Sequence, residues 1–199
     1  MNEFIFEIPH SLSDALCDDL ITMYELEDNK YDGLTFSGVN KLVKDTTDFI
    51  MPKNDKVWER IEKNLYKQLM NGLEEYIKHL NKDEYSNKNN KYHIFDNSGL
   101  QVDCFMLQKY NKCSGRYTYH NDFANESEKN RYRVITFIWY LNDVTDGGET
   151  EFFGGKINIK PEKGKLVLFP ASWAFPHRGK MPLSNDKYII TNWFYKSGL

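Results

Sequence analysis

The chain has 199 residues, 40% hydrophobic and 28% charged, which is the size and composition of one soluble globular domain. A formal net charge of -3 excludes the basic excess of a nucleic-acid-binding surface, so we expect no nucleic-acid partner. The three cysteines lack metal-type spacing, and the sequence has neither a visible signal peptide nor an apolar run near the ~20 residues of a membrane span, which predicts a cytoplasmic protein without membrane contact.

Two helices are predicted in the first half of the chain. After a short strand over Glu3–Ile8, a cap at Ser11 or Ser13 begins a helix that runs to about Glu27, because leucine and isoleucine recur there at helical spacing. A second helix is predicted over Asp55–Leu80, where an apolar residue recurs every fourth position. Neither helix carries residues typical of a chemical site, so we expect both to support a sheet.

Two polar segments are predicted to be exposed loops. Asn81–Ser98 is rich in Asn and Lys, and Phe123–Asn130 is rich in Glu, Asn, Ser and Lys. Loops of this kind commonly order around a substrate, but exposed spacers are about as common. Both interpretations, substrate lid and spacer, therefore stay open for each segment.

From Leu100 onward the pattern changes to short runs of β-branched and aromatic residues with period 2. Segments rich in Gly, Pro and Asn separate these runs, as turns do. The predicted strands are Gln101–Tyr110, Arg116–Asn121, Arg131–Leu141, Glu149–Phe153, Lys156–Lys160, Leu166–Phe169, Ala174–Arg178 and Lys187–Tyr195. Short strands without helices between them are typical of an antiparallel sandwich or barrel, and a jelly roll fits their number.

Together these elements predict a mainly β protein, α+β overall, with a jelly-roll core and supporting N-terminal helices. Residues 1–99 would form the helical support region and residues 100–196 the core. We expect the two parts to make a single domain over residues 1–199, which would act as a monomer or a homodimer.

A candidate metal site begins at His120-Asn121-Asp122. On a strand, residues i and i+2 share one face, so the imidazole and the carboxylate could reach a single ion, although such a pair is more often a surface hydrogen bond. A second imidazole, His177, follows 55 positions after Asp122. Two histidines and one carboxylate make the facial triad of non-haem iron(II), which leaves open positions for a co-substrate and dioxygen. Zinc is the competing metal, since the same ligands suit it.

Lys187 helps to decide between an iron site and a zinc site. Period-2 alternation places Lys187, Ile189, Thr191 and Trp193 on one face of the last predicted strand. A lysine on an inward, apolar face needs an anionic partner, and the distal carboxylate of 2-oxoglutarate would supply one. This favours iron over zinc. The alternative is a lysine at the mouth of the strand that reaches solvent.

With these residues in view, residues 100–196 resemble the prolyl 4-hydroxylase-type branch of the 2-oxoglutarate oxygenases. The resemblance implies a double-stranded β-helix, Fe(2+) held by His120, Asp122 and His177, and a 2-oxoglutarate 5-carboxylate paired with Lys187. It rests on several motifs in a shared order, which are Tyr110, Tyr117, His120-x-Asp122, Arg133-x-x-Thr136, Tyr140-Leu141-Asn142, Gly147-Gly148-Glu149-Thr150-Glu151-Phe152, Gly164, Pro176-His177, Lys187 and Trp193.

The resemblance also implies roles for residues around the metal. Arg133 matches an arginine that relatives place on the substrate side, although it could equally form a structural ion pair, with Asp122 as one candidate partner. The Gly-Gln that collagen-type enzymes commonly carry before the first histidine is missing here, where the chain reads Cys113-Ser114-Gly115-Arg116-Tyr117, so the subfamily stays open. The residues expected to line the 2-oxoglutarate pocket are Tyr110, Tyr140, Thr150, Lys187, Thr191 and Trp193.

The implied reaction is hydroxylation of a prolyl residue in a peptide or protein, with succinate and CO2 as co-products and ascorbate as reductant. One alternative is a hydroxylase on the same scaffold that acts on a free amino acid or another small molecule. A more remote alternative is a non-catalytic jelly-roll binding module. The triad together with Lys187 argues against the last, because a binding module has no need of all four residues.

Overall fold

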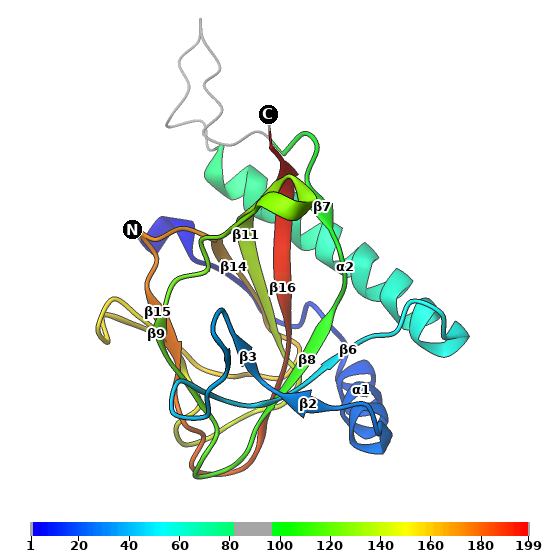
Figure 1. The fold of residues 1–199 in the computed structure, drawn as a ribbon, viewed down its shortest axis with the longest axis vertical. Coiled ribbons are helices and arrows are strands. Elements are labelled where there is room, and N and C mark those ends of the chain that lie inside the picture. Colours follow the sequence, from blue (N-terminus) through cyan, green and yellow to red (C-terminus); the bar gives the residue numbers. More distant parts are fainter. Residues whose placement is uncertain (1, 82–96, 199) are drawn as a thin grey trace, which may run out of the picture.

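The computed structural model describes residues 2–81 and 97–198, and their strands form two antiparallel sheets that face each other (Figure 1). The larger sheet has the strand order β1-β14-β11-β16-β8-β6-β2, with β10 paired to β11 and β7 paired to β16. Its strands are β1 Phe6–Ile8, β2 Tyr31–Asp32, β6 Thr47–Ile50, β7 Gln101–Val102, β8 Met106–Tyr110, β10 Asn125–Glu126, β11 Arg131–Tyr140, β14 Leu166–Pro170 and β16 Lys187–Ser197.

The smaller sheet has the order β13-β12-β15-β9-β5 and lies opposite β11 and β16 in Figure 1. Its strands are β5 Lys44–Asp45, β9 Arg116–His120, β12 Thr150–Phe152, β13 Ile157–Ile159 and β15 His177–Gly179. A separate hairpin joins β3 Leu34–Thr35 to β4 Gly38–Val39. Two facing antiparallel sheets make a jelly roll, so the predicted fold class is confirmed.

Two α-helices cover the face of the larger sheet that is turned away from the smaller one. They are α1 Asp14–Leu26 and α2 Lys56–Leu80, and the short 3-10 turns are η1 Asn2–Phe4 and η3 Ser127–Lys129. The Ser13 side chain caps α1, and the Asp55 side chain accepts hydrogen bonds from the first backbone N–H groups of α2. Both predicted helices are confirmed: α1 ends one residue before the predicted Glu27, and α2 begins one residue after the predicted Asp55 and ends at the predicted Leu80.

Alternation along the central strands divides the interior into two cores. On β11, Phe137 and Trp139 pack with the helices, whereas Ile138 and Tyr140 pack between the sheets. This is the period-2 geometry of a strand that is buried on both faces. The helix side therefore supplies most of the apolar packing, and the space between the sheets is left for side chains with other roles.

The structure differs from the sequence predictions mainly in the first half of the chain. Residues 31–50 form five short strands, β2 to β6, that no pattern predicted, because strands of two to four residues are too short to show clear alternation. The predicted strand Gln101–Tyr110 is split into β7 and β8, and Phe123–Asn130 contains β10 and η3. The predicted loop Asn81–Ser98 falls almost wholly outside the described residues, so it stays a prediction.

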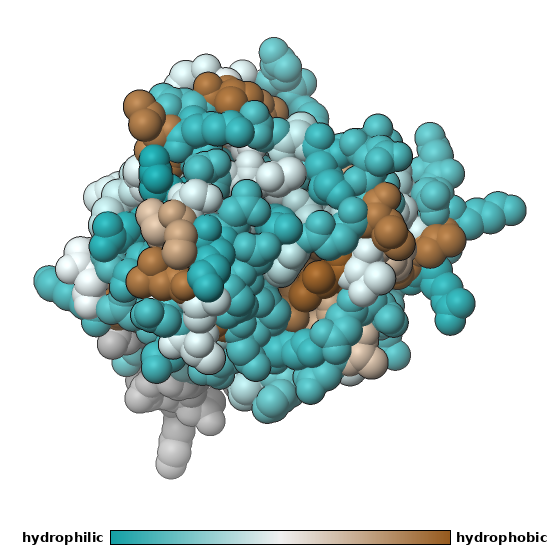
Figure 2. Space-filling model, turned by 90° about the horizontal axis from the view of Figure 1, so that it is seen from below, coloured by the Kyte–Doolittle hydropathy of each residue, from teal (hydrophilic) through white to brown (hydrophobic). Residues whose placement is uncertain are grey.

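The surface seen from below is mostly hydrophilic, with apolar side chains in separate groups (Figure 2). Within the described ranges, no helix is long and apolar enough to cross a membrane. Among the exposed apolar side chains are Leu34 and Phe36 on the β3–β4 hairpin and Phe123 after β9, all three of which border the cavity described below.

Candidate metal centre

His120, Asp122 and His177 come together between the two sheets. His120 ends β9 and His177 begins β15, and the two are paired in register across the smaller sheet. The Nε2 atoms of His120 and His177 lie 3.6 and 3.5 Å from the two carboxylate oxygens of Asp122. One ligand atom from each residue lies within 4.8 Å of the others, so the three predicted ligands can reach one ion.

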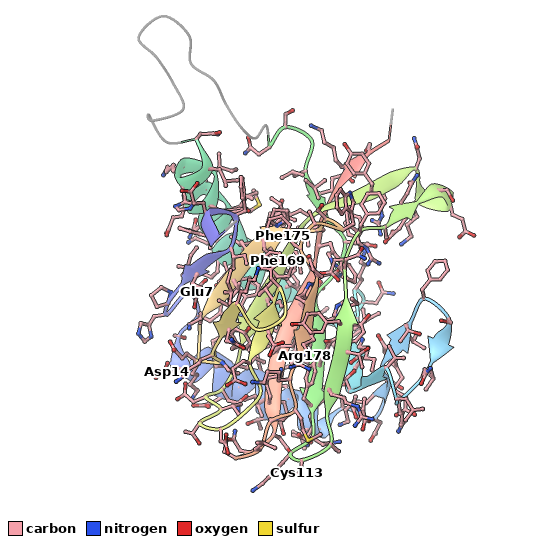
Figure 3. The ribbon with its side chains drawn as sticks, turned by 90° about the vertical axis from the view of Figure 1, so that its left-hand side faces the viewer. Glu7, Asp14, Cys113, Phe169, Phe175 and Arg178 are labelled. Carbon is pink, nitrogen blue, oxygen red and sulfur yellow. The ribbon has the colours of Figure 1, made fainter. Side chains whose placement is uncertain are left out.

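Backbone contacts fix which ring nitrogen each histidine offers. Nδ1 of His120 lies 2.8 Å from the Thr118 carbonyl, and Nδ1 of His177 lies 3.0 Å from the Phe175 carbonyl. A carbonyl accepts a hydrogen bond from Nδ1–H, so Nε2 is the nitrogen that each ring turns towards the centre. Aromatic rings pack against His177: Phe169 lies 4.9 Å from its ring, and Phe169 and Phe175, both labelled in Figure 3, belong to the same core cluster.

The charge states also suit a metal. Burial and the neighbouring His177 lower the pKa of His120 to about 4, so its imidazole is neutral near pH 7. Burial alone would raise the pKa of Asp122, but the two histidines and the Thr136 hydroxyl, which donates to Oδ2 at 2.7 Å, outweigh it and lower that pKa. Two imidazoles and one ionised carboxylate are the donor set that iron(II) takes in facial-triad sites.

A cavity of about 460 Å³ opens beside the triad. Of the residues predicted to line the 2-oxoglutarate pocket, Tyr110, Thr150, Lys187, Thr191 and Trp193 line this cavity. Tyr140 does not: it is fully buried behind the wall, where its hydroxyl donates to Thr150 Oγ1 at 2.6 Å. Tyr140 therefore acts on the cavity through Thr150, because β12 comes between β11 and the open space.

Lys187 is buried in the wall of this cavity, with 1% of its surface exposed. Its Nζ donates to the Gly148 carbonyl at 2.9 Å and lies 3.9 Å from the centre of the Tyr110 ring. No carboxylate of the described residues forms an ion pair with it. Burial lowers the pKa of Lys187 to about 7, against the opposing effect of Glu149. A lysine that reaches solvent does not fit these contacts, whereas an incoming carboxylate does.

Arg133 also lines the cavity, and its charge is paired elsewhere than expected. Its guanidinium lies 3.4 Å from the centre of the Trp193 ring and 3.4 Å from Glu126 of β10. The candidate ion pair with Asp122 is thus replaced by one with Glu126. Arg133 nevertheless lines the cavity, a position that is compatible with contact to a substrate.

Three contacts at the centre were not predicted. The Thr136 hydroxyl fixes Asp122, the Tyr117 ring stacks on His120 with centroids 3.6 Å apart, and Lys44 and Asp48 line the cavity from β5 and β6. The spacing of Arg133 and Thr136 was the only sequence signal for the first of these. Tyr117 was a motif residue of the resemblance, but its contact with His120 within β9 was not foreseen. The positions of Lys44 and Asp48 depend on pairing between short strands, for which the sequence has no local pattern.

Comparison with known sequences adds to this geometry. Residues 105–195 match the family described as the 2OG-Fe(II) oxygenase superfamily. The chain is 28% identical over 122 residues to Prolyl 4-hydroxylase subunit alpha-1 of Gallus gallus, which covers 53% of this chain and 23% of that protein. It is 32% identical over 103 residues to Prolyl 4-hydroxylase 1 of Arabidopsis thaliana, with 39% of this chain and 35% of that protein covered. The match thus spans well under half the length of these relatives.

Solved structures share the fold. A viral collagen prolyl hydroxylase from Paramecium Bursaria Chlorella virus-1 superposes with a TM-score of 0.62 at 23% identity, covering 97% of this chain and 96% of that chain. A Pseudomonas putida prolyl-4-hydroxylase gives 0.68 at 19% identity, covering 96% and 92%. A Trichoplax adhaerens prolyl hydroxylase, solved with a hypoxia inducible factor peptide, gives 0.68 at 18% identity, covering 98% and 84%. Residues 105–195 of this chain thus match the 2OG-Fe(II) oxygenase superfamily, and the sequence relatives named above are prolyl 4-hydroxylases.

Proposed function

We propose that this protein is an Fe(II)- and 2-oxoglutarate-dependent dioxygenase that hydroxylates prolyl residues in a peptide or protein, in the manner of a procollagen-proline 4-dioxygenase. The observation that carries the proposal is one cavity whose wall contains both a two-histidine, one-carboxylate cluster and a buried lysine without a carboxylate partner among the described residues. Relatives named as prolyl 4-hydroxylases support the prolyl substrate, and the peptide bound to the Trichoplax adhaerens structure supports a peptidyl one.

His120, Asp122 and His177 would hold the iron through two Nε2 atoms and one carboxylate oxygen. Iron(II) with bound 2-oxoglutarate supplies oxidation of an unactivated C–H bond by dioxygen, with succinate and CO2 as co-products, and ascorbate would keep the metal reduced. The chain fixes the ligands before the metal arrives, since Thr118 and Phe175 orient the imidazoles and Thr136 orients the carboxylate. The apolar rings around His177 exclude water from that side.

Lys187 would bind the distal carboxylate of 2-oxoglutarate. A carboxylate beside its ammonium group would replace water lost on burial and would favour the charged form of the lysine. Tyr110, which is paired in register with Lys187 and lines the same cavity, brings a phenol hydroxyl to this end, and Thr191 lies four residues along the same face of β16. Together they would make one polar end of the cavity that suits a carboxylate group.

A turnover assay tests the proposal. Purified protein with iron(II), ascorbate and 2-oxoglutarate is expected to release succinate, and a panel of proline-rich peptides is expected to stimulate this release and to gain one oxygen in mass. Free L-proline and other amino acids serve as the comparison arm. If only a free amino acid stimulates succinate release, the substrate is a small molecule and the proposal of a peptidyl substrate is wrong. No succinate and no bound iron under any condition would refute the enzyme.

Replacing Thr136 with valine is expected to weaken iron(II) binding by about 10- to 100-fold, the usual effect of removing a side chain that orients a metal ligand. The valine keeps the volume but removes the hydroxyl that donates to Asp122 Oδ2. Competition with a fluorescent chelator measures the affinity. Thr22→Val, which changes a threonine on the surface of α1, is the matched control, and equal affinities in both variants would contradict the role of Thr136.

The affinity for 2-oxoglutarate is expected to fall as pH rises above about 7. The lowered pKa of Lys187 means that the empty pocket holds a growing share of neutral lysine above that pH, and only the protonated form pairs with a carboxylate. Each further pH unit should then weaken binding about tenfold. Calorimetric titrations from pH 6 to pH 9 measure this. Lys187→Arg, which stays protonated throughout, should flatten the profile, and a flat wild-type profile would contradict the assignment.

A further inference from the structure

A buried ion pair lies in the wall of the cavity, outside the groups assigned so far. Lys44 Nζ of β5 lies 2.6 Å from Asp48 Oδ2 of β6, with 5% and 1% of the two side chains exposed. Gln108 of β8 donates from Nε2 to the same oxygen at 3.2 Å, and the Thr46 hydroxyl donates to Oδ1 at 2.7 Å. Lys44, Asp48 and Gln108 all line the cavity, and we call these three residues the polar wall.

The polar wall lies between the cavity entrance and the co-substrate face of β16. Asp48 is paired in register with Gln108, and Gln108 with Ile189, which follows Lys187 by two residues. On the other side, the strand order places β6 towards the outside, near the exposed lining residues Leu34 and Phe36. A molecule that enters there and approaches the metal would pass the polar wall.

The polar wall is also next to the metal ligands. Lys44 is paired in register with Tyr117 of β9, and its Nζ lies 5.5 Å from the centre of the Tyr117 ring. That ring stacks on His120 with centroids 3.6 Å apart. One aromatic ring therefore separates the lysine from a candidate iron ligand.

Stability does not explain a buried ion pair at this place. The cost of taking two charges out of water offsets most of their attraction, and apolar replacements of such pairs are often neutral or stabilising. Hydrogen-bond capacity is left over as well. Lys44 gives one of its three N–H groups to Asp48, and the described residues offer no acceptor to the other two, nor any donor to the Gln108 amide oxygen.

We propose that the polar wall binds the peptide group that follows the target proline, an inference that rests on the proposed function. Lys44 donates to the proline carbonyl oxygen, Gln108 accepts from the next residue's N–H, and Asp48 positions both. The Lys44–Asp48 pair carries no net charge, so the wall matches a neutral amide better than the free carboxylate of an amino acid. A site that hydrogen-bonds a substrate group rejects analogues that lack the group, because its own polar atoms are then left unpaired.

The test measures peptide binding in protein loaded with zinc and 2-oxoglutarate, which holds the site without turnover. The probe is a capped alanine-proline repeat peptide of ten residues, titrated by calorimetry beside free L-proline. Gln108→Leu and the double variant Lys44→Met/Asp48→Leu are each expected to weaken peptide binding at least tenfold. Their affinity for 2-oxoglutarate should change less than twofold. Gln101→Leu, the same substitution at an exposed position of the same sheet, should bind peptide as the wild type does.

A second probe isolates the predicted hydrogen bond. Lactic acid in place of the alanine after each proline turns that amide into an ester and removes the N–H. This ester peptide should bind the wild type more weakly than the amide peptide, and Gln108→Leu should not distinguish the two. Equal loss in both proteins, or unchanged peptide affinity in the variants, would overturn the polar wall while the proposed function stands. Wild-type protein that fails to bind 2-oxoglutarate would overturn both.

Discussion

Replacing His177 with alanine is expected to abolish iron(II) binding and, with it, succinate formation. The substitution removes one of the two Nε2 donors and leaves a buried carboxylate with a single imidazole beside it. Loss of a side chain that only orients a ligand costs about 10- to 100-fold in affinity, so loss of the ligand itself should exceed that range. Equilibrium dialysis followed by metal analysis measures the first effect, and succinate release measures the second.

His79→Ala is the matched control for this experiment, because it removes a histidine from α2 that contacts Phe6 and the Glu3 carbonyl and has no place in the cavity. Thermal unfolding of the metal-free proteins shows whether either change damages the fold. His177→Ala protein that stays folded and keeps stoichiometric iron would contradict the metal centre, and with it the proposed function.

Replacing Lys187 with methionine is expected to weaken 2-oxoglutarate binding by about 30-fold or more. Removing one partner of a buried charge pair costs about 2–5 kcal/mol, and each 1.4 kcal/mol is about a factor of ten in affinity. Iron binding should be unchanged, because Lys187 is separate from the three ligands. Calorimetric titration with 2-oxoglutarate measures the loss, and succinate, which shares only part of the ligand, serves as a weaker comparison.

The fold of this variant can be checked independently. Burial lowers the pKa of Lys187, which means that its charge is unfavourable in the empty pocket, so methionine should keep or raise the melting temperature. Weak binding in a protein of undiminished stability is then a property of the pocket alone. Lys187→Arg should retain part of the affinity, since arginine also pairs with carboxylates. Unchanged affinity for 2-oxoglutarate in the methionine variant would contradict the assignment of Lys187 to the co-substrate site.

The regular part of the fold was predictable from the sequence because long elements repeat their pattern many times. Asp55–Leu80 has an apolar residue at every fourth position along most of its length behind a cap, and the structure places α2 at Lys56–Leu80. The strand predicted over Lys187–Tyr195 is found as β16, Lys187–Ser197, because alternation over many residues is an unambiguous signal. Tyr31–Asp32 and Lys44–Asp45 could not be predicted, because their strand character comes from the partners they pair with.

The site was predictable to the extent that its residues share a local face. Lys187 and Thr191 are four residues apart on one strand, so alternation places that pair on one face. His120 and Asp122 are two residues apart, but β9 ends at His120, so nearness in the sequence rather than strand alternation brings them together. Tyr140 lies on the same face of β11 as Ile138, but Thr150, a residue of the smaller sheet, separates it from the cavity. Alternation along β11 could not reveal this. Glu126 as the partner of Arg133, and Asp48 as the partner of Lys44, follow from strand pairing that the sequence does not encode locally.

The position of β16 in the middle of the larger sheet has a consequence for how this protein can change. Its backbone is paired to β11 on one side and to β8 and β7 on the other, so its amides should exchange with solvent only when the whole domain unfolds. β5 is a two-residue strand at a sheet edge, where local opening is far less costly. Substitutions near Lys187 and Thr191 therefore put the entire fold at risk. Substitutions that keep the buried Lys44–Asp48 pair but alter β5 act on a strand that can open by itself, so under the proposed roles substrate binding can change more easily than co-substrate binding.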